Sequence, residues 1–145
     1  MTRVCPLPTR ADFPVRRPMP TRWADDDAYG HANNVVYYAW FDTTVNGWLM
    51  DATGTDVRRL PAIGVVAETS CRYLAPVGFP DQLEIGLGVD RLGGRSITYR
   101  LGVFRVGEEL PSALGRFVHV YVDAATRRPV PVPEVVRSAV TALTT

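Results

Sequence analysis

The sequence VVYYAWFDTTVNGWLM at residues 35–50 is the stretch that decides the fold. We expect Asn33 or Asn34 to cap the start of a helix here, because an Asn side-chain oxygen accepts an unpaired N–H of the first turn. Gly54 is expected to end the helix. Aromatic and β-branched residues are weak helix formers, so the pattern predicts a helix that is buried and held by packing. The side chains that recur at the spacing of one helical face are Val36, Tyr37, Trp40, Phe41, Thr44, Val45, Trp48 and Leu49.

Downstream of Pro61, the hydrophobic pattern changes to a period of two, which is typical of β-strands. Gly93-Gly94 predicts a tight hairpin between two of these strands. In the first strand, we expect the odd-numbered residues from Val65 to Ala75 to share one face. The expected strands lie at residues 64–75, 83–90, 97–103 and up to about residue 122.

The two ends of the chain complete this pattern. Residues 13–22 contain Pro18 and Pro20, which lack N–H groups and restrict the segment to a sheet edge. The sequence PVPVP at residues 129–133 ends the sheet, and residues 134–143 predict a short terminal helix. A sheet with one apolar helix has to wrap around that helix to bury it. We therefore expect an α+β fold, in which an antiparallel sheet wraps around one long central helix.

Composition limits the classes of function. The chain has 145 residues, of which 46% are hydrophobic and 21% are charged, and this suffices for a packed core without a metal or disulfide. We expect a tail at residues 1–12 and one domain at residues 13–145. A net charge of +1 argues against a strongly basic nucleic-acid binder. All 16 basic residues are arginine, which excludes a Schiff base on a protein lysine and a Walker-A phosphate loop.

The expected cellular location of the protein follows from the lack of membrane-span and secretory-signal patterns in the sequence. No apolar run approaches the roughly 18 residues of a membrane span. The N-terminus is interrupted by prolines and arginines and does not resemble a secretory signal, so we expect a cytoplasmic protein. Cys5, in the tail, and Cys71, in a strand, are expected to be free thiols in that compartment. With cysteines and histidines scattered singly, we expect neither a metal nor an organic cofactor.

The segment WADDDAYGHANN at residues 23–34 concentrates reactive side chains just before the helix. A helix N-terminus offers unpaired N–H groups that can polarise a carbonyl oxygen. A carboxylate a few residues upstream can face the carbon of that carbonyl, which suits transfer of an acyl group to water. Gly30 permits a sharp turn or a close approach of substrate. Alternatively, these residues only cap and turn the chain. Of the three aspartates, we expect two to be solvated and one to face inward.

The run RWADDDAYGHANNVVYYAWFD at residues 22–42 resembles the 4-hydroxybenzoyl-CoA thioesterase family of hot-dog-fold acyl-CoA thioesterases. That family typically shows an Arg, an aromatic residue, D-x-D, two residues, Gly-His and then x-N-N-x-x-Y-x-x-x-F-E. The sequence YLAP at residues 73–76 is similar to the family's Y-x-x-P, whereas FDTTV at residues 41–45 departs from its F-E-x-A-R. The matching residues are Arg22, Trp23, Asp25, Asp27, Gly30, His31, Asn33, Asn34, Tyr37 and Phe41.

The resemblance implies a hot-dog fold, with the helix as the sausage and the sheet as the bun. It places the catalytic carboxylate on Asp27, as a general base acting on water or as a nucleophile that forms an anhydride. The N–H that binds the thioester carbonyl belongs to the first helical turn, around Asn33 and Asn34. His31 is either a proton carrier or a structural histidine. We expect catalytic roles for Asp27, His31 and Asn34, and substrate contacts for Gly30, Asn33, Tyr37, Glu68, Arg95 and Ser96.

Several side chains outside the loop have two interpretations. Glu68 either orders water near the thioester or is a solvated or ion-paired strand residue. His119 is expected to pack at an interface. The aromatic stripe of the helix is either core or the dimer-facing wall of an acyl pocket.

Arginines flank the Gly93-Gly94 hairpin, with Ser96 adjacent to it. Their fixed fork of donors suits the phosphates of CoA, although an ordinary charged hairpin is the alternative. We favour Arg95 as the phosphate contact, because backbone N–H groups of the preceding turn can also face an anion. The three arginines are Arg91, Arg95 and Arg100.

These patterns predict an enzyme that hydrolyses an acyl-CoA thioester to a free acid and CoA. The resemblance implies a homodimer, often assembled into a homotetramer, with sites at the interface. We expect no nucleic-acid partner and no membrane partner. The alternatives are a non-catalytic acyl-CoA-binding hot-dog module and a thioesterase acting on an acyl carrier protein. A hot-dog dehydratase or hydratase would need a different His-containing arrangement, which the sequence lacks.

Overall fold

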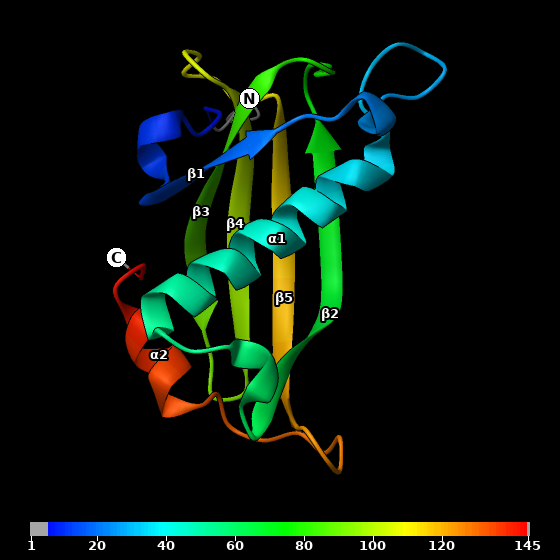
Figure 1. Cartoon of the computed structure of the whole chain (residues 1–145). Coiled ribbons are helices and arrows are strands. Elements are labelled where there is room, and N and C mark those ends of the chain that lie inside the picture. Colours follow the sequence, from blue (N-terminus) through cyan, green and yellow to red (C-terminus); the bar gives the residue numbers. More distant parts are fainter. Residues whose placement is uncertain (1–5, 145) are drawn as a thin grey trace, which may run out of the picture.

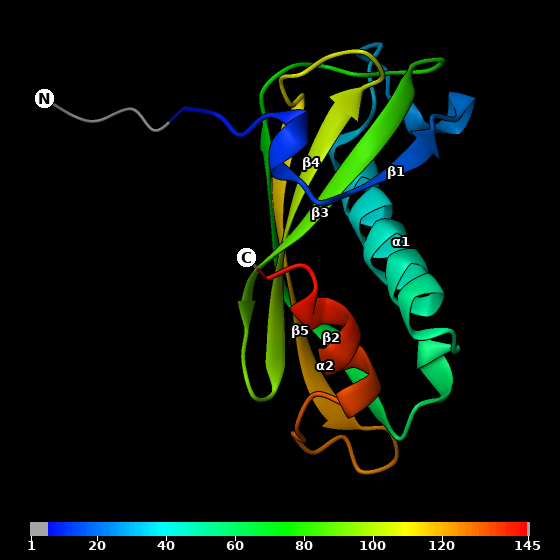
Figure 2. The ribbon, with the colours of Figure 1, turned by 90° about the vertical axis from the view of Figure 1, so that its left-hand side faces the viewer.

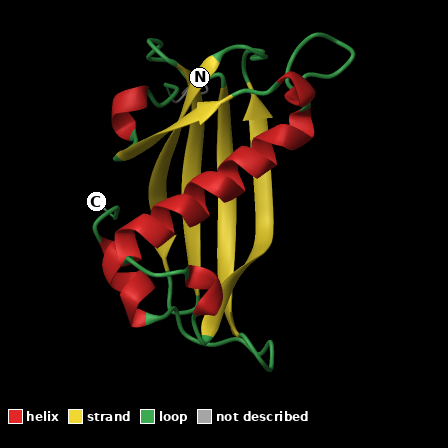
Figure 3. Cartoon of the chain, in the orientation of Figure 1, coloured by secondary structure: helices red, strands yellow, loops and turns green. Residues whose placement is uncertain are grey.

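The computed structural model describes residues 6–144, in which a long helix lies across one face of a five-stranded antiparallel sheet (Figure 1; Figure 3). The strand order is β1-β3-β4-β5-β2. Cys5 lies outside the described residues, and Cys71 is a free thiol in β2. The elements are β1 (Val15–Pro20), α1 (Asn34–Thr53), β2 (Ala62–Tyr73), β3 (Gln82–Leu92), β4 (Ser96–Arg105), β5 (Ala113–Asp123) and α2 (Glu134–Thr141), with single 3₁₀ turns η1 (Arg10–Asp12), η2 (Trp23–Asp25) and η3 (Val57–Arg59).

Helix α1 begins and ends where its capping residues predict. The Asn33 side chain accepts a hydrogen bond from the Val35 N–H at 3.0 Å, so Asn33 is the N-cap. Gly54 ends the helix with a φ of 66°, in the left-handed region that favours glycine. Six of the eight predicted apolar positions are buried against the sheet, and they are Tyr37, Trp40, Phe41, Thr44, Val45 and Leu49. Packing against the sheet thus stabilises a helix of weak intrinsic propensity.

The sheet edges explain the proline placement and one departure from the expected alternation. Strand β1 pairs only with β3 within the described chain and is therefore an edge strand. Pro18 and Pro20, which lack a backbone N–H, are tolerated there because no strand lies on the outer side to accept a hydrogen bond from them. At the opposite edge, the register of β2 against β5 shifts between Val66 and Glu68. This bulge leaves Ala67 without a pairing partner and turns Val65 and Thr69 to opposite faces. The expectation that odd-numbered residues of this strand share one face is therefore wrong.

The N-terminal residues before β1 are attached to the sheet from Arg10 onward. The Arg10 guanidinium pairs with Glu84 of β3, and the Arg10 N–H donates to the Glu109 carbonyl at 2.9 Å. Phe13 is 1% exposed and packs edge-to-face on Phe104, with ring centroids 5.6 Å apart. These contacts hold part of the expected tail against β3 and β4.

Helix α2 lies on the same side of the sheet as α1 and holds the β3–β4 hairpin in place (Figure 2). The Arg137 guanidinium donates to the Gly93 carbonyl at 2.7 Å and to the Gly94 carbonyl at 3.2 Å. Val136 and Val140 are fully buried beneath the helix. The terminal helix thus closes the end of the core at which α1 finishes.

His119 of β5 is a buried histidine among aromatic rings. It is 2% exposed, and its ring centroid lies 4.9 Å from that of Phe117 and 5.9 Å from that of Tyr99. Burial disfavours the charged imidazolium and lowers the pKa of His119 to about 4. The imidazole is therefore neutral in the folded protein at neutral pH.

This burial predicts a specific pH dependence of stability. Because the folded pKa of His119 lies below that of an unfolded histidine, the unfolded state binds the extra proton as the pH falls. The free energy of unfolding should be constant above about pH 6.5 and should fall by up to about 3 kcal/mol as the pH approaches 4. Chemical denaturation at a series of pH values measures this change.

A His119→Phe variant keeps an aromatic ring and should flatten the pH dependence between about pH 6.5 and 4.5. The matched control is His31→Gln, which changes an exposed histidine and should retain the slope of the parent protein. Equal slopes for the parent and His119→Phe would contradict the assignment.

Candidate active site

Asp25 stabilises the loop that precedes α1. It is 1% exposed, and its carboxylate accepts hydrogen bonds from the Arg22 backbone N–H at 2.8 Å and from the Arg22 guanidinium at 2.7 Å. Its carbonyl accepts the Asn33 N–H at 2.9 Å. Both ends of the loop are thereby tied to Asp25, directly before the first turn of the helix.

Asp26 binds the same loop to the segment that follows β2. Its carboxylate accepts the Phe79 N–H at 3.0 Å, while Ala32 donates its N–H to the Val77 carbonyl at 2.7 Å. One aspartate, Asp25, is buried as expected, and the other two are partly exposed, although Asp26 also holds the loop in place.

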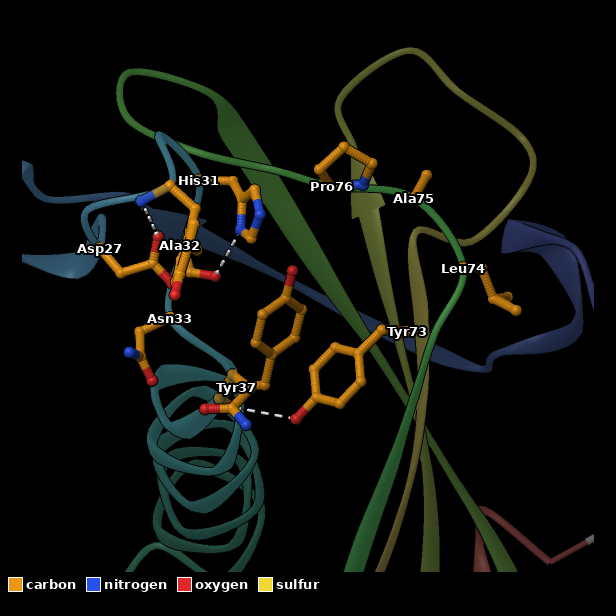
Figure 4. Close-up of a pocket in the computed structure, with 11 residues that line it drawn as sticks. Asp27, His31, Ala32, Asn33, Tyr37, Tyr73, Leu74, Ala75 and Pro76 are labelled. Carbon is orange, nitrogen blue, oxygen red and sulfur yellow. Dashed lines mark hydrogen bonds between the residues drawn. The ribbon is translucent and has the colours of Figure 1, made fainter.

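Asp27 is the aspartate that faces a pocket (Figure 4). Its Oδ1 accepts the Tyr29 N–H at 2.8 Å, and its Oδ2 accepts no hydrogen bond from residues 6–144. Gly30 has a φ of 89° and closes the turn with an N–H donated to the Asp27 carbonyl at 3.2 Å. The turn thus leaves one oxygen of a carboxylate available to a bound molecule.

The pocket has a volume of about 530 Å³ and lies between the helix N-terminus and the segment after β2. That size is within the range of small-molecule sites. Its lining is Asp27, Tyr29, His31, Ala32, Asn33, Asn34, Tyr37, Tyr73, Leu74, Ala75 and Pro76. It therefore combines polar groups from the loop with an apolar wall.

The first turn of α1 contributes one unpaired N–H to this lining. The Asn33 N–H is bonded to Asp25, the Val35 N–H to the Asn33 side chain, and the Val36 N–H to the Asn33 carbonyl at 3.0 Å. The N–H of Asn34 has no acceptor within residues 6–144. A helix N-terminus with a free N–H is a ready site for a carbonyl oxygen or an anion.

Two tyrosines form the wall opposite the loop. The Tyr73 hydroxyl donates to the Asn34 carbonyl at 3.0 Å, and its ring packs edge-to-face on Tyr37 with centroids 4.9 Å apart (Figure 4). Burial raises the pKa of Tyr37 to about 12 and raises the pKa of Tyr73. Both phenols therefore stay protonated at neutral pH, and Tyr73 steadies the first turn of α1.

The structure brings most of the predicted site residues together. Asp27, His31, Asn33, Asn34 and Tyr37 line the pocket, and Gly30 lies in the same loop. The His31 ring is exposed, with Nδ1 at 3.4 Å from the Ala32 carbonyl oxygen.

Three predicted substrate contacts lie elsewhere. Glu68 is not among the lining residues and forms an ion pair with Arg116. Ser96 begins β4, whereas the far end of β4 reaches the pocket, where Arg105 donates to the Pro76 carbonyl at 2.7 Å. Arg95 and Ser96 are thus separated from the pocket of their own chain by roughly 30 Å of strand.

Part of the apolar wall of the pocket was not predicted from the sequence. Residues 73–76 line the pocket, although only the Y-x-x-P pattern marked them and no site role was expected for them. Of the other hairpin arginines, Arg100 donates to the Asp12 carbonyl at 2.9 Å and lies over the Phe13 ring. Arg100 therefore has a structural partner in this chain.

Within residues 6–144, no group of three or more His, Cys, Asp and Glu side chains is arranged to hold a metal ion. None of the helices in this described part has the length and hydropathy of a membrane span.

The sequence profile of the thioesterase-like superfamily matches residues 21–140. This chain belongs to that superfamily. The match includes the loop, α1 and the whole sheet except β1, so the pocket lies within the family region. Among curated proteins, no sequence matches this chain.

Solved structures support the same assignment. The PA5185 protein from Pseudomonas aeruginosa PAO1 is 46% identical, with a TM-score of 0.92 over 97% of this chain and 98% of that one. PA2801, a candidate thioesterase from Pseudomonas aeruginosa, is 29% identical, with a TM-score of 0.79 over 86% of this chain and 95% of that one.

A more distant structure shows the fold alone. The 1,4-dihydroxy-2-naphthoyl-CoA thioesterase from Synechocystis is 14% identical, with a TM-score of 0.80 over 88% of this chain and 96% of that one. Together, the family match and these structures confirm the expected α+β hot-dog fold. The 4-hydroxybenzoyl-CoA subfamily stays a prediction.

Proposed function

We propose that this protein is a cytoplasmic thioesterase that hydrolyses an acyl-CoA to a free acid and CoA. The observation that carries the proposal is the meeting of two groups in one pocket, namely the free carboxylate oxygen of Asp27 and the unpaired N–H of Asn34. A thioester needs both a polarised carbonyl and an activated oxygen nucleophile, and these groups supply one each.

In this mechanism, the thioester carbonyl oxygen accepts the Asn34 N–H, and the helix N-terminus stabilises the negative charge that develops there. Asp27 then takes one of two roles. As a general base, it removes a proton from water while the water oxygen bonds to the carbonyl carbon. As a nucleophile, it bonds to that carbon itself and forms an anhydride that water cleaves. In both roles the C–S bond breaks and the CoA sulfur receives a proton.

The surroundings of the pocket suit an acyl group. Tyr37, Tyr73, Leu74 and Pro76 form an apolar wall beside the helix N-terminus. An apolar wall lowers the local dielectric and strengthens the hydrogen bond from Asn34 to a developing oxyanion. We infer that the acyl group packs on this wall, and we extend the proposal to the 4-hydroxybenzoyl-CoA subfamily on the strength of the loop motif.

Recognition of the nucleotide part of CoA requires a second copy of the chain if Arg95 takes part. Because Arg95 lies at the opposite end of the sheet from the pocket of its own chain, only a partner chain can bring it close. Strand β2 has an unpaired outer edge within the described residues, and Val66 on it is 46% exposed. We infer a homodimer, or a tetramer built from it, that covers this edge.

The carboxylate role predicts the effect of Asp27→Asn, which keeps the size of the side chain and removes the base. Turnover of an acyl-CoA should fall by roughly 10²- to 10⁴-fold. The fold should persist, because the Asp27 carboxylate accepts one local hydrogen bond. Release of the free CoA thiol from a panel of acyl-CoA substrates, measured with purified protein, tests this.

Asp25→Asn is the matched control in the same loop. It should lower the free energy of unfolding by about 2 kcal/mol, since it weakens charge-assisted hydrogen bonds to Arg22. Near-normal turnover by Asp27→Asn, or a larger loss of turnover with Asp25→Asn, would overturn the role of Asp27. Activity confined to acyl carrier protein thioesters would show that the substrate is a carrier-protein thioester and not an acyl-CoA. Binding of an acyl-CoA without turnover would indicate a non-catalytic module.

The proposed assembly predicts a dimer or tetramer by analytical ultracentrifugation at micromolar concentration. Val66→Asp should shift the protein toward monomer and reduce activity, because a charge on the exposed edge disfavours strand pairing.

In the intact oligomer, Arg95→Ala should raise KM for an acyl-CoA with kcat nearly unchanged, and should have no effect on a pantetheine thioester. A fully active monomer would contradict the assembly, and equal effects on both substrates would contradict the phosphate contact.

A further inference from the structure

A second cavity lies at the other end of α1, and the mechanism above uses none of its lining residues. It has a volume of about 190 Å³ and shares no lining residue with the first pocket. About 18 Å of helix separates Tyr37 in the first pocket from Leu49 in the second. Its lining is Asn46, Leu49, Val57, Arg58, Leu60, Ile63, Gly64, His119, Tyr121 and Val136.

The cavity contains polar groups that lack protein partners. Neither ring nitrogen of His119 makes a hydrogen bond within residues 6–144, and Nδ1 is buried without a partner. Tyr121 is 3% exposed, and its hydroxyl has no hydrogen-bond partner among the same residues. Buried polar atoms are normally hydrogen-bonded, so the unpartnered Nδ1 of His119 is available to a polar group of a molecule bound in this cavity.

Glycine at position 64 is what leaves this space open. A Cβ on Gly64 would lie 2.9 Å from His119 Nδ1 and 3.2 Å from the Tyr121 ring. Any larger side chain would therefore press on both rings. The opening beside His119 and Tyr121 depends on the absence of that side chain.

The remaining groups define the charge of a fitting molecule. The Arg58 guanidinium is already paired with Asp56, at 2.9 Å. The Asn46 side-chain nitrogen donates to the Asp42 carbonyl at 2.9 Å, which leaves the Asn46 oxygen as an acceptor. The other walls are the apolar side chains of Leu49, Leu60 and Val136. With no unpaired charge in an apolar enclosure, the cavity favours an uncharged molecule.

We propose that this second cavity is a binding site for a small uncharged aromatic alcohol, held by His119 and Tyr121. An apolar cavity of about 150 Å³ accommodates benzene, so about 190 Å³ suits one aromatic ring with a small substituent. A neutral imidazole has one donor and one acceptor, and a hydroxyl group can satisfy either. The proposal is independent of thioester hydrolysis, because no residue of the first pocket takes part.

Phenol is the probe for this site, and the full chain is titrated with it by ¹H–¹⁵N NMR. Saturable shifts are expected for the amides of Gly64, His119 and Tyr121, with a Kd in the millimolar range or tighter. Toluene, which lacks the hydroxyl, should bind about threefold to tenfold more weakly, as expected for loss of one hydrogen bond. Benzoate should give no saturable shift at these amides.

Two variants separate the hydrogen bonds from the shape of the cavity. His119→Phe and Tyr121→Phe each keep a ring, and either should weaken phenol binding while leaving toluene binding unchanged. Tyr73→Phe is the matched control, because it removes a hydroxyl from the first pocket and should not alter phenol binding at Gly64.

Shifts confined to Asn34 and Tyr73 would overturn the proposal, as would the absence of saturable shifts, which would mean that the cavity holds only water. Equal affinities for phenol and toluene would also contradict it. If His119→Phe does not fold, Tyr121→Phe alone decides the outcome.

Discussion

The ring of Phe41 lies against the backbone of Gly115 in β5, and the remaining geometry depends on this contact. A Cβ on Gly115 would lie far inside van der Waals contact with the Phe41 ring, so only glycine permits the approach. Phe41 is fully buried, and its close packing on β5 sets the height and direction of α1 over the sheet. The helix N-terminus is consequently placed beside Tyr73 at the end of β2.

The site follows from that placement. Once the first turn of α1 is fixed, the loop before it is held by Asp25 on one side and by Asp26 on the other. These bonds leave Asp27 as the aspartate whose second carboxylate oxygen is open to the pocket. The three consecutive aspartates thus have separate roles, of which two stabilise the loop and one faces a ligand. The same helix ends at the second cavity, so one element positions both sites.

The periodic parts of the molecule could be predicted from sequence because their signals are local. The stripe from Val36 to Leu49 predicted α1, and the glycine pair at residues 93–94 predicted the β3–β4 hairpin. Distances across the fold could not be predicted in this way. Arg95 and Ser96 were expected at the substrate, yet they lie at the far end of β4, and no local pattern reports which end of a strand meets a loop. The bulge at Ala67 likewise arises from pairing with β5.

The most direct test of the roles of Asp27 and Asn34 is a crystal structure with a non-hydrolysable acyl-CoA analogue, in which a methylene separates the carbonyl from the sulfur. The carbonyl oxygen should accept the Asn34 N–H at about 2.7–3.1 Å. The carbonyl carbon should lie about 3–3.5 Å from the Asp27 carboxylate or from a water bound to it. A carbonyl held by other donors, with the Asn34 N–H facing solvent and Asp27 remote from the carbon, would contradict these roles.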